Sequence, residues 1–292
     1  MGHAFSCMLT TVRTDAVVQR GAPTLVPPNA DLTAMMDPLA TVLLVAALVV
    51  AGAPAAVAQS EGGQPEGASA DSAAALRQET HTFAGTTAGA SVRLRYLLAL
   101  PDGYADGDEA WPLVLFLHGA GERGDDLSSV TAHGPPRLVR EGRRFPFILV
   151  SPQSPEERWW QPAELAALVD AIESDYRVDP DRIYVTGLSM GGFGTWGLLE
   201  AYPDRFAAGA PVCGGGTPGK ICAAREVPVW AFHGALDTVV PLVRSQEMVD
   251  RLERCDGDVR LTVYPEAGHD SWTETYANPE LYDWLLSQRR GE

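Results

Sequence analysis

The chain has 292 residues, of which 46% are hydrophobic and 21% charged, a composition that excludes an intrinsically disordered protein and allows an ample core. It carries 22 Lys and Arg against 38 Asp and Glu, a net charge of −16, which argues against nucleic acid or an anionic membrane surface as a partner. The length suits one large domain or two modest ones.

The N-terminal part contains an uncharged apolar run at residues 41–58 that ends in Ala-Val-Ala, the small-residue pattern cleaved by signal peptidase. Its strongly apolar part is shorter than the roughly 20 residues of a membrane-spanning helix. We therefore predict a signal peptide at 1–58 and a secreted or periplasmic protein. No Lys or Arg lies between Met35 and the run, so either the charged region is unusually long or residues 1–34 precede the true start.

Residues 59–79 are rich in Gly, Ala, Ser and Glu and have no apolar period, which predicts a flexible linker. From residue 80 to residue 292 we expect one catalytic domain, because strand-like and helix-like patterns alternate. The predicted strands lie at 82–101 (two strands and a turn), 112–119, 145–153, 182–189, 206–214, 227–234 and 259–265. The predicted helices lie at 162–176, 191–203, 242–255 and 279–289.

Such alternation predicts an α/β fold, a doubly wound and mainly parallel sheet with helices on both faces. Functional residues in this architecture gather at the carboxyl ends of the strands. Four predicted strands end there in the Gly-rich turn 118–121, in Ser189, in Asp237 and in His269. The order serine, acid, histidine is that of the α/β-hydrolase triad.

Each of these residue types has a role in nucleophilic catalysis. Because a serine hydroxyl is a poor nucleophile at neutral pH, His269 is expected to accept the proton of Ser189, and Asp237 to orient the imidazole. The oxyanion needs two donors, for which we predict the backbone N–H groups of Met190 and Ala120. Gly187 and Gly191 flank Ser189 closely enough that a side chain on either would crowd a strand-to-helix turn.

Five separated segments also resemble a known family. They are LPDGY…WPLVLFLHGAGERGDD, VSPQSPEERWW, VTGLSMGGFGTW, VWAFHGALDTVVP and YPEAGHDSW. They are similar to the serine carboxylesterases of the α/β-hydrolase fold, in particular to the small secreted group of predicted peptidases or phospholipase/carboxylesterase-like proteins, related to feruloyl esterases and polyhydroxybutyrate depolymerases. The resemblance covers roughly residues 95–288 and implies Ser189, Asp237 and His269 as the triad. We expect this chain to consist of the catalytic domain, without the immunoglobulin-like domain that some relatives carry.

Other polar residues near these strand ends have simpler interpretations. His118 and His233 each precede a glycine after a strand, and we expect both to be structural rather than catalytic. Asp270 follows His269 directly, and adjacent side chains diverge, so it is a poor orienter of the imidazole. Arg123 lies in the charged run 122–126, which is either a solvated turn or a segment that shapes the site.

Trp159 and Trp160 follow the strand at 145–153 and are expected to border the cleft. Either they provide an apolar or aromatic subsite for the substrate, or they serve core and rim packing. The pair Cys222 and Cys255 is a plausible disulfide in an exported protein, with Cys213 left over. We expect no metal and no cofactor, since no His, Cys or Asp cluster has ligand spacing.

The predicted activity is hydrolysis of a small-molecule or polymer-borne carboxylic ester through an acyl-enzyme. A serine peptidase related to the prolyl oligopeptidases is the alternative, although those usually carry a propeller domain. A lipase is disfavoured because no long apolar lid insertion is evident, and a dienelactone hydrolase because Ser189 stands where that enzyme has Cys. A binding module without catalysis would be expected to lack a triad member. We expect no nucleic-acid partner and no membrane insertion after signal cleavage.

Overall fold

The computed structural model describes residues 78–291. The predicted signal peptide and most of the predicted linker therefore lie outside the described residues. The first strand already begins at Glu79, inside the segment 59–79 that was predicted as a linker.

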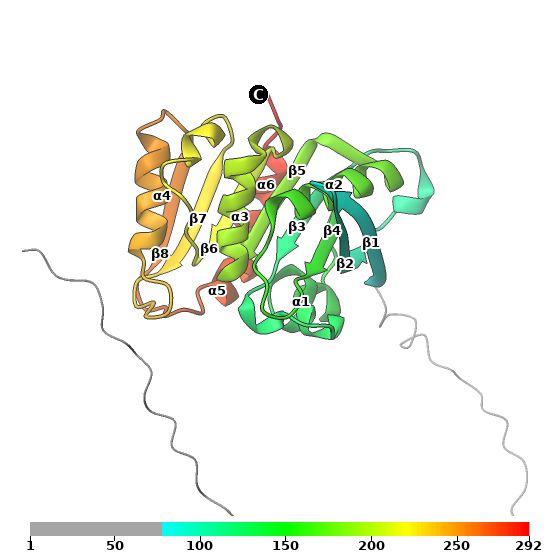
Figure 1. The fold of residues 1–292 in the computed structure, drawn as a ribbon, viewed down its shortest axis with the longest axis horizontal. Coiled ribbons are helices and arrows are strands. Elements are labelled where there is room, and N and C mark those ends of the chain that lie inside the picture. Colours follow the sequence, from blue (N-terminus) through cyan, green and yellow to red (C-terminus); the bar gives the residue numbers. More distant parts are fainter. Residues whose placement is uncertain (1–77, 292) are drawn as a thin grey trace, which may run out of the picture. The chain divides into compact units, whose positions relative to one another are not determined.

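An eight-stranded sheet forms the centre of the described part (Figure 1). Its strands are β1 (Glu79–Thr87), β2 (Ala90–Ala99), β3 (Trp111–Leu117), β4 (Ile148–Gln153), β5 (Val178–Leu188), β6 (Ala208–Val212), β7 (Val229–Gly234) and β8 (Val259–Tyr264). The order across the sheet is β1-β2-β4-β3-β5-β6-β7-β8. β1, β2 and β4 pair antiparallel, whereas the strands from β4 to β8 pair parallel. The predicted mainly parallel α/β fold is confirmed.

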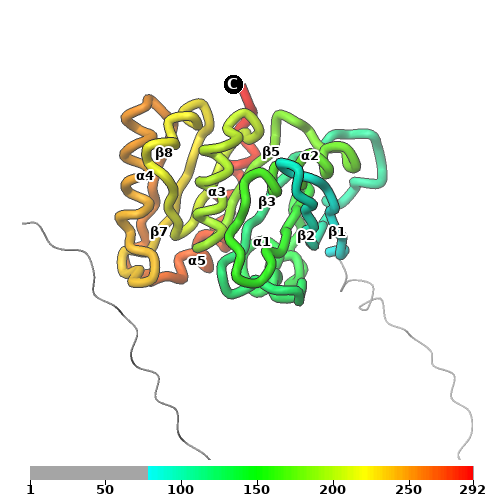
Figure 2. The backbone as a smooth tube through the Cα atoms, in the orientation of Figure 1, coloured from blue at the N-terminus to red at the C-terminus, as the bar shows by residue number. Residues whose placement is uncertain are grey.

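Six α-helices cover the two faces of the sheet in the described residues. They are α1 (Gly134–Arg140), α2 (Pro162–Asp175), α3 (Met190–Ala201), α4 (Val243–Glu253), α5 (Trp272–Ala277) and α6 (Pro279–Ser287). Successive side chains of a strand point to opposite faces, so Leu115 of β3 packs with α2, α3 and α4 in one core cluster, whereas Phe116 packs with α1, α5 and α6 in another. Figure 2 follows the same path as a continuous tube, with the crossovers that carry the chain between the faces.

Three features differ from the prediction. α1 and α5 were not predicted: they are only seven and six residues long, too short to show an apolar period. β5 begins at Val178 rather than at 182, because its polar first residues continue the pairing of β3 through Trp111 and Val178. These polar first residues of β5 show no alternation of apolar and polar side chains in the sequence.

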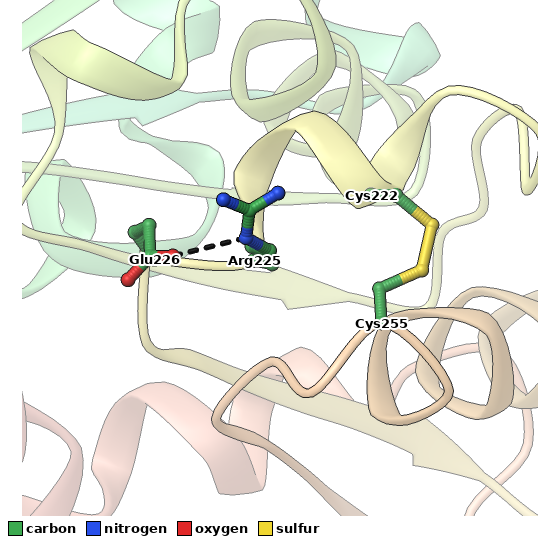
Figure 3. The surroundings of a disulfide bond; sticks show 4 residues. All are labelled: Cys222, Arg225, Glu226 and Cys255. Carbon is green, nitrogen blue, oxygen red and sulfur yellow. Dashed lines mark hydrogen bonds and ion pairs between the residues drawn. A yellow bond between two sulfur atoms is a disulfide. The ribbon is translucent and has the colours of Figure 1, made fainter.

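A disulfide joins Cys222, in a 3₁₀ helix (Ile221–Ala224) between β6 and β7, to Cys255, just after α4 (Figure 3). This pair agrees with the predicted one, and Cys213 is a buried free thiol. Within residues 78–291, every helix is too short or too polar to span a membrane.

Candidate active site

Ser189 lies on the turn between β5 and α3, in a strained backbone conformation. Its φ of 52° and ψ of −115° are rarely adopted by a residue with a side chain. The turn has no spare room: a Cβ on Gly187 would lie 2.5 Å from the Gly191 carbonyl oxygen, and a Cβ on Gly191 would collide with the carbonyl of Leu117 in β3. Close backbone packing therefore requires both glycines and holds the serine at the carboxyl end of the strand.

Ser189, His269 and Asp237 come from the ends of three different strands and form one hydrogen-bonded chain. Ser189 Oγ lies 3.0 Å from His269 Nε2, and His269 Nδ1 lies 2.7 Å from Asp237 Oδ2. With its proton on Nδ1, the imidazole donates to the carboxylate and accepts from the serine hydroxyl. The Asp237 side chain is fully buried and that of His269 is 20% exposed. The hydrogen-bonded residues therefore lead from the core to the solvent-accessible surface.

The carboxylate of Asp237 is fixed from both sides. Its Oδ1 accepts hydrogen bonds of 2.9 Å from the backbone N–H groups of Val239 and Val240. Burial alone would raise the pKa of Asp237, but the hydrogen bonds from His269 and from these two N–H groups outweigh it and hold the pKa below its usual value. Asp237 therefore stays ionised beside His269 and can stabilise an imidazolium there.

The Gly-rich turn after β3 packs against the Ser189 turn. A Cβ on Gly119 would approach the Leu188 side chain to 2.8 Å. Ala120 begins a 3₁₀ helix and is exposed, and Met190 begins α3. The first N–H groups of a helix have no acceptor within the helix, and they attract anions. Both predicted oxyanion donors thus follow adjacent parallel strands, β3 and β5, at the edge that carries Ser189.

His118 and Trp160 support this turn from inside. His118 is 1% exposed; its Nδ1 donates to the Gly119 carbonyl at 2.6 Å and its Nε2 accepts from the Ser154 N–H at 3.0 Å. Burial lowers the pKa of His118 to about 4, so the ring stays neutral. The Trp160 indole donates to the His118 carbonyl at 3.1 Å and is 7% exposed. The Trp160 ring lies in a core cluster, which supports the packing alternative for this residue.

The sequence left two roles open for Arg123, and the structure shows one contact that bears on them. Its Nε donates to the carbonyl oxygen of Ala120 at 2.9 Å, and the side chain is partly exposed. The guanidinium thereby braces the turn that carries a predicted oxyanion donor. This contact supports the reading in which Arg123 shapes the site.

Exposed apolar side chains occur on loops that follow the carboxyl ends of β4 and β7 and at the start of α4. Trp159 is 56% exposed and stands edge-on to Phe193, four residues after Ser189, with ring centroids 5.7 Å apart. Leu236 and Val239, which flank the acid, are 58% and 66% exposed, and Val243 at the start of α4 is 47% exposed. We call Trp159, Leu236, Val239 and Val243 the apolar rim.

Cys213 lies beneath the serine. Its Sγ accepts the Ser189 N–H at 3.3 Å, and burial raises the pKa of this thiol to about 12. Cys213, Asp237 and His269 offer ligand atoms within 4.8 Å of one another and are, among the described residues, the group with the donor set for a metal ion. The protonated thiol and the hydrogen bond between Asp237 and His269 oppose such a use.

Two polar residues near Asp237 have contacts that the sequence did not predict. His233, expected only to pack, lies 3.3 Å from Asp237 Oδ2, and Ser245 of α4 lies 2.8 Å from His233 Nδ1. The spacing of four residues between His233 and Asp237 was the available signal. Asp270 instead accepts from the N–H and hydroxyl of Thr273 at the start of α5, which agrees with its dismissal as an orienter.

Comparison with known proteins gives a consistent picture. Residues 153–281 match the model of the dienelactone hydrolase family. The chain is 32% identical to poly(3-hydroxyalkanoate) depolymerase C of Paucimonas lemoignei over 36% of this chain and 28% of that protein. It is 26% identical to a probable feruloyl esterase C of Aspergillus terreus over 56% and 62%. A solved thermostable esterase is 34% identical, with a TM-score of 0.61 over 72% of this chain and 63% of the other.

The chain thus spans less than two thirds of the length of each of these three relatives. The family match also qualifies one expectation. Ser189 in place of Cys argued against a dienelactone hydrolase. The model of that family nevertheless matches the segment from the end of β4 to the first residues of α6.

Proposed function

We propose that this chain, an α/β-hydrolase with a dienelactone hydrolase family domain at residues 153–281 and esterase relatives, is a serine carboxylesterase whose nucleophile is Ser189. The observation that carries the proposal is the chain of hydrogen bonds from Ser189 Oγ through His269 to the buried Asp237. A strained serine at the end of a central strand and a histidine oriented by an ionised carboxylate are the parts that acyl transfer needs.

The reaction proceeds in two halves. Ser189 Oγ attacks the ester carbonyl while His269 Nε2 takes its proton, and the resulting oxyanion accepts hydrogen bonds from the N–H groups of Met190 and Ala120. The tetrahedral intermediate collapses to an acyl-serine, and the departing alcohol receives its proton from His269. Water, deprotonated by His269, then attacks the acyl-serine and releases the acid and the free Ser189 hydroxyl.

The apolar rim indicates the kind of ester. Large apolar side chains that are exposed on loops at the same sheet edge as a reactive group are suited to bind an apolar or aromatic part of a ligand. The names of two relatives, a feruloyl esterase and a poly(3-hydroxyalkanoate) depolymerase, refer to esters of that kind. We infer that the substrate carries an apolar or aromatic group next to its ester, and that Trp159 contacts it.

Export of the enzyme is part of the proposal. The Cys222–Cys255 disulfide supports it, because such bonds persist in oxidising compartments. Mass spectrometry of protein recovered from outside the cytoplasm should give an N-terminus at Gln59, and a mature chain that still contains residues 41–58 would contradict signal cleavage.

The decisive experiment is a hydrolysis panel of p-nitrophenyl esters, feruloyl esters and prolyl peptides with the wild type, Ser189→Ala and the exposed control Ser287→Ala. We expect ester hydrolysis by the wild type and the control and loss of it in Ser189→Ala. A fluorophosphonate probe should label Ser189 in the wild type and in the Ser287→Ala control, and should not label Ser189→Ala. Undiminished ester turnover in Ser189→Ala contradicts the mechanism, and peptide cleavage with negligible ester turnover favours the peptidase alternative.

A further inference from the structure

The acid of the proposed triad has a second histidine partner. His233 ends β7 and Asp237 follows four residues later, and both side chains are fully buried. His233 Nε2 lies 3.3 Å from Asp237 Oδ2, the same oxygen that accepts the Nδ1–H of His269 at 2.7 Å. Oδ1 is already occupied by two backbone N–H groups. Asp237 Oδ2 therefore lies between two imidazole rings.

The tautomer of His233 follows from its neighbours. Nε2 faces two acceptors, the carbonyl oxygen of Val240 at 2.8 Å and Asp237 Oδ2, so this nitrogen carries the proton. Nδ1 lies 2.8 Å from Ser245 Oγ. Ser245 Oγ also lies 2.9 Å from the carbonyl oxygen of Gly214 and is held in place there. His233 thus carries its proton on the opposite ring nitrogen from His269.

His233 is also unsuited to act as the base itself. Both of its ring nitrogens are occupied and its side chain is inaccessible to solvent. Burial lowers its pKa, and the adjacent charge of Asp237 only partly opposes this, so the ring remains neutral. The groups around it are Asp237 from its own loop, His269 from the loop after β8 and Ser245 from α4.

We propose that His233 is a positioning residue for the esterase reaction: its Nε2–H, which donates to the Val240 carbonyl at 2.8 Å, also faces Asp237 Oδ2 at 3.3 Å and holds it toward His269, while Ser245 Oγ contacts the other ring nitrogen and keeps the ring in place. The inference rests on the proposed function of Ser189, Asp237 and His269. Without the His233 donor, Oδ2 keeps His269 as its one remaining hydrogen-bond partner, and the carboxylate can turn Oδ2 away from the position that orients the imidazole. Misplacement of a reacting group by about 1 Å can cost about a hundredfold in rate.

The test compares His233→Leu, which removes the donor, with His233→Gln, whose amide N–H can occupy the place of Nε2–H. We expect kcat of His233→Leu to fall about ten- to a hundredfold with KM within about twofold, and His233→Gln to recover most of that loss. Ser245→Ala should lower kcat less, by about three- to tenfold.

A spectroscopic signature separates positioning from general destabilisation. The low-field proton resonance of the His269 Nδ1–H should be displaced or broadened in His233→Leu and restored in His233→Gln. Tyr282→Phe, which removes a buried hydroxyl bonded to the Tyr276 carbonyl, is the control, and it should keep the resonance and the kcat of the wild type. If His233→Leu does not fold, Ser245→Ala and His233→Gln carry the same comparison.

Two results would overturn the inference: wild-type kcat and an unmoved resonance in folded His233→Leu, or a His233→Gln variant as slow as His233→Leu. Failure of the proposed function is distinguishable from both. It would appear as ester turnover that survives Ser189→Ala, whatever the His233 variants do.

Discussion

The turn that carries Ser189 and the loop that carries Asp237 lie at the same edge of the sheet, but different forces hold them. The Ser189 turn is fixed by steric contact: a Cβ on Gly191 would meet the backbone of β3, and a Cβ on Gly192 would meet the carbonyl of Val212 in β6. The Asp237 loop is fixed by hydrogen bonds: two backbone N–H groups and the His269 imidazole bond the carboxylate, and His233, 3.3 Å from Oδ2, bonds the Val240 carbonyl.

The difference predicts how each region fails. A steric contact tolerates no added atom, so a single methyl group in the Ser189 turn should disturb the whole sheet edge. A hydrogen-bonded carboxylate tolerates an isosteric replacement in shape but not in charge, so changes in the Asp237 loop should reduce catalysis while the fold persists.

Gly191→Ala should have the largest effect. Its methyl group would collide with the Leu117 carbonyl, which forces β3 and α3 apart, and we expect a loss of more than about 4 kcal/mol of unfolding free energy together with all activity. Urea unfolding followed by tryptophan fluorescence measures it. Gly219→Ala is the matched control: nothing lies within 4 Å of its added Cβ, so its stability should stay within about 0.5 kcal/mol of the wild type. A wild-type midpoint for Gly191→Ala would contradict the steric account.

Asp237→Asn should leave the fold intact and lower kcat by about 10⁴-fold, because an amide neither stabilises the imidazolium nor selects the Nδ1–H tautomer of His269. Steady-state kinetics and an unfolding curve measured on the same preparation separate the two effects. Asp270→Asn is the control, since that carboxylate bonds Thr273 instead of the imidazole. Equal kinetic losses in both variants would mean that the acid has been assigned wrongly.

The same contrast explains what the sequence could predict. Steric requirements appear in the sequence as glycines around Ser189, and the order of strand ends places Asp237 and His269 after it. Hydrogen-bond partners from distant elements leave no such pattern, so the contact between Ser245 and His233 could not be foreseen. Within the adjacent pair Trp159 and Trp160, nothing in an aperiodic loop indicates that the first ring is exposed and the second buried.

The Cys222–Cys255 disulfide constrains the chain by a covalent bond, in contrast to the steric contacts of the Ser189 turn and the hydrogen bonds of the Asp237 loop. Cys222→Ser, Cys255→Ser and the double variant should each lose about 3–4 kcal/mol of unfolding free energy, because the bond closes a long loop with a sequence separation of 33. Calorimetry or urea unfolding measures it, and kcat should be unchanged because the bond lies away from the sheet edge that carries Ser189. A double variant that loses twice as much as each single variant would show that the two thiols contribute independently and not as a bond.

The smallest expected effect concerns the buried ring of His118, which is held by hydrogen bonds, and the dependence of stability on pH. Its Nε2 accepts the Ser154 N–H, so protonation of the ring would turn two donors toward each other inside the core. Burial holds its pKa at about 4, below the ordinary value of 6.5, so the unfolded chain binds the extra proton first as pH falls. The stabilisation is complete above about pH 6.5 and is lost progressively as pH falls toward 4.

The wild type should therefore lose about 2 kcal/mol more than His118→Gln between pH 7 and pH 5. Unfolding free energies from urea titrations at these two pH values give the comparison, and parallel losses would exclude a buried neutral His118. Unlike Asp237, whose depressed pKa keeps a charge beside His269, His118 is depressed to remain uncharged beneath the Gly-rich turn.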